Sequence, residues 1–144
     1  MKGEPLGPMH GLPIGVKDVT TTAGIRTTFA SPLFMDYVPE EDAEAVRRLK
    51  AAGAIVLAKT NTPEFACGAN TNNTLFGPTR NPWNPALSPA GSSGGSAVAV
   101  ATGMTALAQG TDLYSQTPEQ FAAFLVAQTT KWTKVAKAAG MHAD

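Results

Sequence analysis

The chain has 144 residues, of which 43% are hydrophobic and 15% charged, and its eleven basic and eleven acidic residues give zero formal net charge. This composition predicts a globular chain with a core, and it excludes the basic surface that attracts nucleic acid or an anionic membrane. The single Cys67 cannot form an internal disulfide, and the distant His10 and His142 do not make a metal site. No stretch has the pattern of a signal peptide or the length of a membrane span, so we expect a cytoplasmic chain without metal or cofactor.

The first half of the sequence predicts a strand, a helix and a second strand. Short β-compatible residues around Lys17 indicate a strand over residues 12–19. Residues 39–53 start with a proline and acidic residues and end with basic residues and a glycine, which is typical of a helix. The apolar run "AIVLAKT", residues 54–60, indicates a strand that is covered on both faces. A helix followed by such a strand predicts an α/β fold.

The second half begins with a long loop over residues 70–89, which is rich in proline and asparagine and has no helical or strand period. Its two large aromatic residues, Phe76 and Trp83, favour a loop that is packed onto a surface. The Gly/Ser turn "GSSGGS", residues 91–96, then leads into small residues that predict a tightly packed, buried helix. A strand is expected over residues 105–110, "TALAQG".

The C-terminal residues differ from the rest in composition. Thr117 and Gln120 have the spacing of a capping box, with proline at the first helical position between them. Apolar residues then recur at helical spacing from Phe121 to Val135, and lysines lie towards the end. We therefore expect a separate amphipathic helix within residues 114–144.

Two features could carry chemistry. Lys17 is flanked by apolar residues, and burial would favour its neutral amine, which can act as a general base. The alternative is an edge-strand lysine whose amine lies in water. Residues 91–96 combine glycines with a helix start, where free N–H groups suit an oxyanion or a phosphate; the alternative is a flexible linker. The segment lacks the pattern of a phosphate-binding loop or a dinucleotide fingerprint.

Five segments together resemble the amidase signature family in order and spacing: "GPMHGLPIGVKD", "AIVLAKTNTPEFACG", "FGPTRNPWNP", "SPAGSSGGSAVAVATGM" and "ALAQGTD". This family includes fatty acid amide hydrolases, bacterial amidases and the tRNA-dependent amidotransferases. The resemblance covers residues 3–113, about the second quarter of a usual member. It implies a fragment of a mixed-sheet α/β core with flanking helices, and hydrolysis of small carboxylic amides by a Ser/bridging Ser/Lys triad without a cofactor.

The resemblance assigns roles to individual residues. Lys17 matches the catalytic lysine, the base that ultimately receives the proton of the nucleophile. Ser92 matches the bridging serine, whose preceding peptide bond is cis in the family. Ser93 matches a neighbouring serine that supports the network by hydrogen bonding. Residues 80–83 match a turn that approaches this loop and has a structural role.

The nucleophile of the family is missing in register. In the family, the "GTD" motif continues through one residue and two glycines to the nucleophilic serine. Here Tyr114 and Ser115 stand at the two glycine positions, and Gln116 stands at the nucleophile position. Ser115 is a weak substitute because adjacent side chains in an extended segment point to opposite sides. The departure predicts little hydrolytic activity.

The tail resembles the C-terminal helix of the substrate-binding receptors of tripartite tricarboxylate transporters, without their ligand-binding loops. The simplest interpretation is a hybrid of two parts, a partial amidase-signature domain over residues 1–113 and a helix of different origin over 114–144. The alternative to an amidase-type hydrolase is therefore a non-catalytic truncated or chimeric fragment. Such a fragment would act, if at all, as an interaction module or a homo-oligomer formed through exposed apolar surface.

Overall fold

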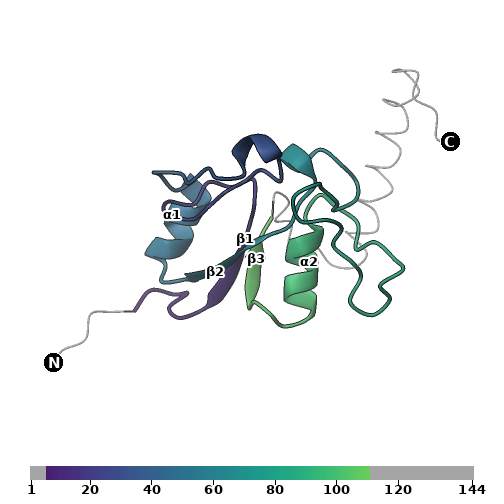
Figure 1. The fold of residues 1–144 in the computed structure, drawn as a ribbon. Helices are drawn as coiled ribbons and strands as arrows, with labels where there is room; N and C mark the ends of the chain where they lie inside the picture. The colour runs from purple at the N-terminus through teal and green to yellow at the C-terminus, as the bar shows by residue number, and fades with distance from the viewer. Residues whose placement is uncertain (1–5, 111–144) are drawn as a thin grey trace, which may run out of the picture. The chain divides into compact units, whose positions relative to one another are not determined.

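The computed structural model describes residues 6–110, which belong to the first of two compact units, Met1–Thr111 and Asp112–Asp144. The helix expected within residues 114–144 lies outside the described residues. The α/β class is confirmed (Figure 1). In chain order, the elements are β1 (Pro13–Lys17), the 3-10 helix η1 (Pro32–Phe34), α1 (Glu44–Ala51), β2 (Ile55–Thr60), the 3-10 helix η2 (Glu64–Ala66), α2 (Gly94–Ala101) and β3 (Leu107–Gln109).

The three strands form one parallel sheet in the order β2-β1-β3. The pairing of β1 with β2 runs from Pro13 opposite Ile55 to Lys17 opposite Thr60, with a shift in register after the second pair. On its other side, β1 pairs with β3 and places Val16 opposite Gln109. Because parallel strands end at the same edge of a sheet, the polar residues at the three carboxyl ends lie close together.

The two faces of β1 have different partners. Alternate residues of a strand point to opposite faces, and Ile14 and Val16 point towards α1, where they form a core with Val46 and Ala54. Lys17 lies on the opposite face and is hydrogen-bonded to Ser92, just before α2. The central strand therefore separates an apolar layer from a polar one, and the polar layer carries the candidate site.

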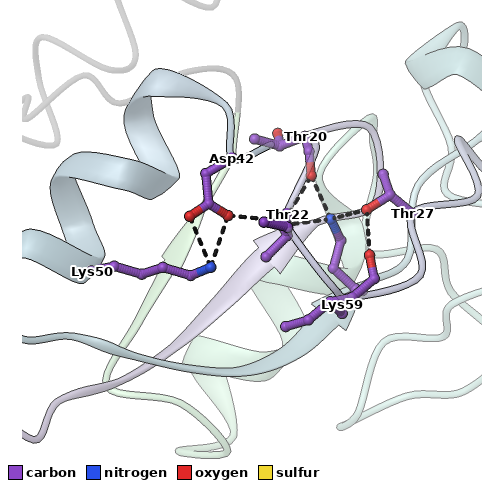
Figure 2. Close-up of polar contacts among 8 residues, drawn as sticks. Thr20, Thr22, Thr27, Asp42, Lys50 and Lys59 are labelled. Carbon is purple, nitrogen blue, oxygen red and sulfur yellow. Dashed lines mark hydrogen bonds and ion pairs between the residues drawn. The ribbon is translucent and has the colours of Figure 1, made fainter. Parts of the chain in front are cut away.

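The helix predicted over residues 39–53 begins later than expected, because α1 starts at Glu44. Asp42 accounts for part of the difference, since its carboxylate accepts the backbone N–H of Ala23 at 2.7 Å and the ammonium of Lys50 at 2.8 Å (Figure 2). The hydrogen bond from Lys50 holds the pKa of Asp42 below its usual value. Asp42 thus joins an earlier loop to the helix instead of forming its first turn. The predicted stop at Gly53 is confirmed by its positive φ of 94°.

The expectation that β2 is covered on both faces is wrong within residues 6–110. Ile55 and Leu57 are 56% and 57% exposed, because β2 is an edge strand of a three-stranded sheet. Helix α2 is also less buried than predicted, with Val100 exposed on its outer side. In this described part of the chain, no helix is long and apolar enough to cross a membrane.

The long loop over residues 70–89 is confirmed, since it holds neither helix nor strand. Trp83 is 73% exposed, so the expected packing of its ring onto a surface is wrong. The loop is held instead by amide groups: Asn73 Nδ2 donates to Asn61 Oδ1 at 2.6 Å and to the Thr62 carbonyl at 2.8 Å. This polar anchor ties the loop to the segment that follows β2.

Candidate active site

The site is centred on a contact between Lys17 and Ser92. Lys17 is the last residue of β1, its side chain is fully buried, and its Nζ donates to Ser92 Oγ at 2.6 Å. The alternative of a solvated edge-strand lysine is wrong because β1 is the central strand. The two groups lie within the range at which a base and a hydroxyl exchange a proton. The structure thus brings together the two residues that the resemblance assigned to catalysis.

The turn that carries Ser92 is held at both ends by one side chain. Thr71 Oγ1 donates to the Ala90 carbonyl at 3.0 Å and accepts the N–H of Gly94 at 2.9 Å. Between these anchors, the Gly91–Ser92 peptide bond is cis, as the resemblance implies. A Cβ at Gly94 would lie 2.4 Å from Thr71 Oγ1, so only glycine fits there. The alternative of a flexible Gly/Ser linker is wrong for this segment.

The first turn of α2 is fixed against the ends of β2 and β3. Ser96 Oγ lies 2.6 Å from Thr60 Oγ1 and also donates to the Gln109 carbonyl at 3.3 Å. A Cβ at Gly95 would lie 2.4 Å from the backbone nitrogen of Asn61, which shows how closely the helix approaches the chain after β2. These contacts set the distance between the Ser92 turn and the strand that carries Lys17.

Ser93 stands at the N-cap position of α2, and its carbonyl accepts the N–H of Ala97 at 2.9 Å. Its hydroxyl faces Gly110, where an added Cβ would lie 3.0 Å from Ser93 Oγ. The supporting role of this hydroxyl in a catalytic network stays a prediction. Ser115 and Gln116 lie outside the described residues, so the proposed nucleophile substitute stays a prediction as well.

Asp18 is a site residue that the sequence reasoning missed. It follows Lys17 directly and is almost fully buried, and its carboxylate accepts both the N–H and the hydroxyl of Thr28. Its backbone N–H donates to the Thr60 carbonyl at 3.1 Å, which continues the pairing beyond the strand. The available signal was a carboxylate placed directly after a lysine at the end of an apolar strand.

A cavity of about 330 Å³ opens at the carboxyl ends of β1 and β2. Its lining residues are Asp18, Ile25, Arg26, Thr28, Lys59, Thr60, Asn61 and Phe76. Open α/β sheets bind ligands at this end of their strands, and the volume suits a small molecule. Within residues 6–110, no group of three His, Cys, Asp or Glu side chains is arranged to hold a metal ion.

Lys59, which lines this cavity, is held by the loop that follows β1 (Figure 2). Its Nζ donates to the Thr20 carbonyl and to the hydroxyls of Thr22 and Thr27, the latter two at 3.1 and 3.0 Å. Burial lowers the pKa of Lys59 to about 8, and the nearby Asp18 carboxylate partly opposes this shift. Because three acceptors match the three protons of an ammonium group, Lys59 holds the loop in place.

Comparison with known proteins agrees with this arrangement. Residues 1–113 match the Amidase family. The chain is 56% identical over 105 residues to the A-type subunit of glutamyl-tRNA(Gln) amidotransferase from Roseiflexus castenholzii, covering 73% of this chain and 21% of that protein. The crystal structure of the same type of subunit from Thermotoga maritima is 46% identical, with a TM-score of 0.71 over 74% of this chain and 24% of its own. The native peptide amidase of Stenotrophomonas maltophilia is 43% identical, with a TM-score of 0.66 over 71% of this chain and 22% of its own.

The chain therefore spans about a fifth to a quarter of the length of these relatives. The family match ends at residue 113, and it gives no support to the expected likeness of residues 114–144 to transporter receptors. Over the matched residues, the strands, the Ser92 turn and the Lys17 contact all fit the resemblance seen in the sequence. The chain belongs to the Amidase family.

Proposed function

We propose that the described residues form the base and relay of a site for the hydrolysis of carboxylic amides. The observation that carries this proposal is the 2.6 Å contact between the buried Lys17 amine and Ser92 Oγ. Removal of an amine from water disfavours its charged form, and a neutral amine can accept a proton. Lys17 would be the base, and Ser92 would pass the proton to it.

In this mechanism, a serine hydroxyl attacks the amide carbonyl. Its proton passes to Ser92 Oγ while the proton of Ser92 passes to Lys17 Nζ. The tetrahedral intermediate then collapses, and the leaving amine takes a proton back from Lys17 through Ser92. Water releases the acyl group from the serine by the same route in reverse. The contact between the two residues lets one buried base serve both halves of the reaction.

The attacking serine is the part that this sequence does not supply at the expected position. Gln116 stands there, and its amide cannot act as the nucleophile. Tyr114 and Ser115 replace the glycines expected beside it, and their Cβ atoms restrict the backbone that would present oxyanion donors. We therefore propose that this chain hydrolyses amides several orders of magnitude more slowly than a site with all three members.

The substrate is proposed only as a class. The names of two relatives contain the terms amidotransferase and peptide amidase, and both terms denote chemistry of carboxylic amides. The cavity beside Asp18 has the size of a small-molecule site. We propose a small amide as substrate, without a preference for its acyl or amine part.

The test compares the natural chain with a repaired one carrying Tyr114→Gly, Ser115→Gly and Gln116→Ser. A fluorophosphonate probe should label the repaired chain at position 116, and Lys17→Met in the same background should suppress this labelling. A panel of aliphatic and aromatic amides should show no release of ammonia by the natural chain above a protein-free control. Ammonia release that depends on Lys17 in the natural chain would contradict the missing nucleophile. A repaired chain that folds but stays unlabelled at position 116 would contradict the base and relay.

A second candidate function is favoured by the exposed apolar side chains on the edge strand β2. Ile55 and Leu57 are more than half exposed, and edge strands with apolar surface associate readily. We propose that this strand mediates self-association, with Leu57→Glu shifting the chain towards monomer in sedimentation velocity. A monomer at all concentrations in the natural chain would exclude this candidate.

A further inference from the structure

We propose that Ser92 is itself a nucleophile in this chain and that it accepts acyl groups from activated esters, with Lys17 as its base. In the amidase mechanism, Ser92 only passes a proton, so this is a second activity of the same pair. The inference rests on Lys17 acting as a base, as in the proposed function. It does not require a nucleophile at position 116.

The geometry is that of a nucleophile and its base. Lys17 Nζ and Ser92 Oγ are 2.6 Å apart, which is within the range required for removal of the hydroxyl proton. Serine–lysine pairs with this division of roles occur on unrelated folds. Lys17 is fully buried, whereas Ser92 is only half-buried and Gly91 before it is exposed. The base is thus shielded from water while the hydroxyl lies next to an accessible segment.

The position of Ser92 is also fixed before any ligand arrives. Thr71 holds Ala90 on one side and Gly94 on the other, and Ser96 binds α2 to Thr60 at the end of β2. A nucleophile whose position is already set loses little entropy on reaching the transition state. The same contacts that suit a relay therefore suit a nucleophile.

The backbone amides of the helix start limit which electrophiles can react. The N–H of Gly94 is taken by Thr71 Oγ1, and the N–H of Gly95 is directed to the Asn61 carbonyl at 3.3 Å. These two donors do not serve a tetrahedral oxyanion, and loss of such a donor costs about 10²- to 10³-fold in rate. We therefore expect reaction with esters of good leaving groups, such as p-nitrophenyl esters, and not with amides.

With p-nitrophenyl acetate, acylation and deacylation return the pair to its starting state. Neutral Lys17 Nζ takes the proton of Ser92 Oγ as the oxygen attacks the carbonyl, and a C–O bond forms. The oxyanion then collapses, the bond to p-nitrophenolate breaks, and acetyl-Ser92 remains beside a protonated Lys17. Lys17 returns its proton to the leaving phenolate or to solvent. Water attacks the acetyl ester with Lys17 as base, and this releases acetate and regenerates the serine.

The experiment treats the natural full-length chain with p-nitrophenyl acetate and, separately, with a fluorophosphonate probe. The modified peptide is then identified by mass spectrometry. We expect acetyl and phosphonyl groups on Ser92, with Lys17→Met slowing the modification by about 10²-fold or more. Lys50→Met is the matched control, because this lysine pairs with Asp42 away from Ser92, and it should leave the rate unchanged. Urea unfolding of each variant shows that it is folded.

Mapping on the natural chain decides the inference even where a variant fails to fold. Modification of another residue with Ser92 unmodified would overturn it, as would modification of Ser92 at the same rate in a folded Lys17→Met variant. No modification at all would also overturn it. If Ser92 stays unmodified while the repaired chain is labelled at position 116, the proposed amidase function stands and this inference falls.

Discussion

Thr71 and Gly94 lie 23 residues apart in the sequence and are joined by a buried hydrogen bond, in which the Thr71 hydroxyl accepts the Gly94 N–H at 2.9 Å. The same hydroxyl donates to Ala90, so one side chain of the long loop spans the turn that carries Ser92. The loop is therefore part of the support of the site. A change at Thr71 should reach Ser92 although the two residues have no hydrogen bond to each other.

Replacement of Thr71 by valine should destabilise the chain by about 1 to 3 kcal/mol, because the buried Gly94 N–H loses its acceptor while the shape of the side chain is kept. Thr71→Ser is the matched control, since it keeps the hydroxyl and should retain most of the stability. Urea unfolding measures both variants. The rate of Ser92 modification by p-nitrophenyl acetate should fall in Thr71→Val and recover in Thr71→Ser. An unchanged rate in folded Thr71→Val would show that the turn keeps its geometry without this residue.

The close approach of α2 to the chain after β2 at Gly95 predicts a strong effect of one added methyl group. A Cβ there would lie 2.4 Å from the backbone nitrogen of Asn61 and 2.6 Å from its oxygen, and backbone atoms cannot rotate away. Gly95→Ala should therefore lower the free energy of unfolding by about 1 to 3 kcal/mol or more. Ala97→Ser, at an exposed position of the same helix, should change it by less than about 0.5 kcal/mol. Equal thermal midpoints for the two variants would contradict this close packing.

The elements that the sequence predicted well are those set by local patterns. The strand around Lys17, the strand over residues 54–60 and the helix after the Gly/Ser turn all appear close to their expected places. The error at the start of α1 has a non-local cause, because Asp42 is used in a contact with Ala23 on another loop. A pattern of acidic residues before a helix does not reveal such a partner.

The candidate site shows the same division. The resemblance to the amidase signature family identified Lys17 and Ser92, and the structure shows them in contact. Thr71 and Asp18 were missed because their roles depend on partners that are distant in the chain. Threonine in a loop and aspartate after a strand are both common, so neither residue type indicates such a role by itself. Three-dimensional contacts were needed to separate them from ordinary polar residues.

Ala90 predicts a substitution that stabilises the turn. Its φ of 65° lies in the left-handed region, which costs a residue with a Cβ about 1 to 2 kcal/mol. Ala90→Gly removes this cost but adds about 0.5 to 1 kcal/mol of chain entropy, so we expect a net gain between zero and about 1 kcal/mol. Ala99→Gly, in the buried interior of α2, should instead lose about 1 kcal/mol or more. Chemical unfolding of both variants checks the contrast, which fails if Ala90→Gly is destabilised as much as Ala99→Gly.

Lys59 predicts a dependence of stability on alkaline pH. Burial lowers its pKa from 10.5 to about 8, so the folded chain holds this proton less firmly than the unfolded chain does. Between these two values, the unfolded state binds more protons, and the free energy of unfolding should rise with pH. Below pH 8, both states are protonated at this residue, and its contribution should be constant. The expected signature is therefore an increase that begins near pH 8 and ends near 10.5.

Other groups titrate in the same range, so the test is the difference between the natural chain and Lys59→Met. Urea unfolding at a series of pH values should show the stability of the natural chain rising relative to that of the variant above pH 8. Lys50→Met provides the control, because the Lys50 side chain is partly exposed and pairs with Asp42. Its difference from the natural chain should not rise over this interval. A falling difference for Lys59→Met would mean that the hydrogen bonds to Thr20, Thr22 and Thr27 stabilise the ammonium more than burial disfavours it.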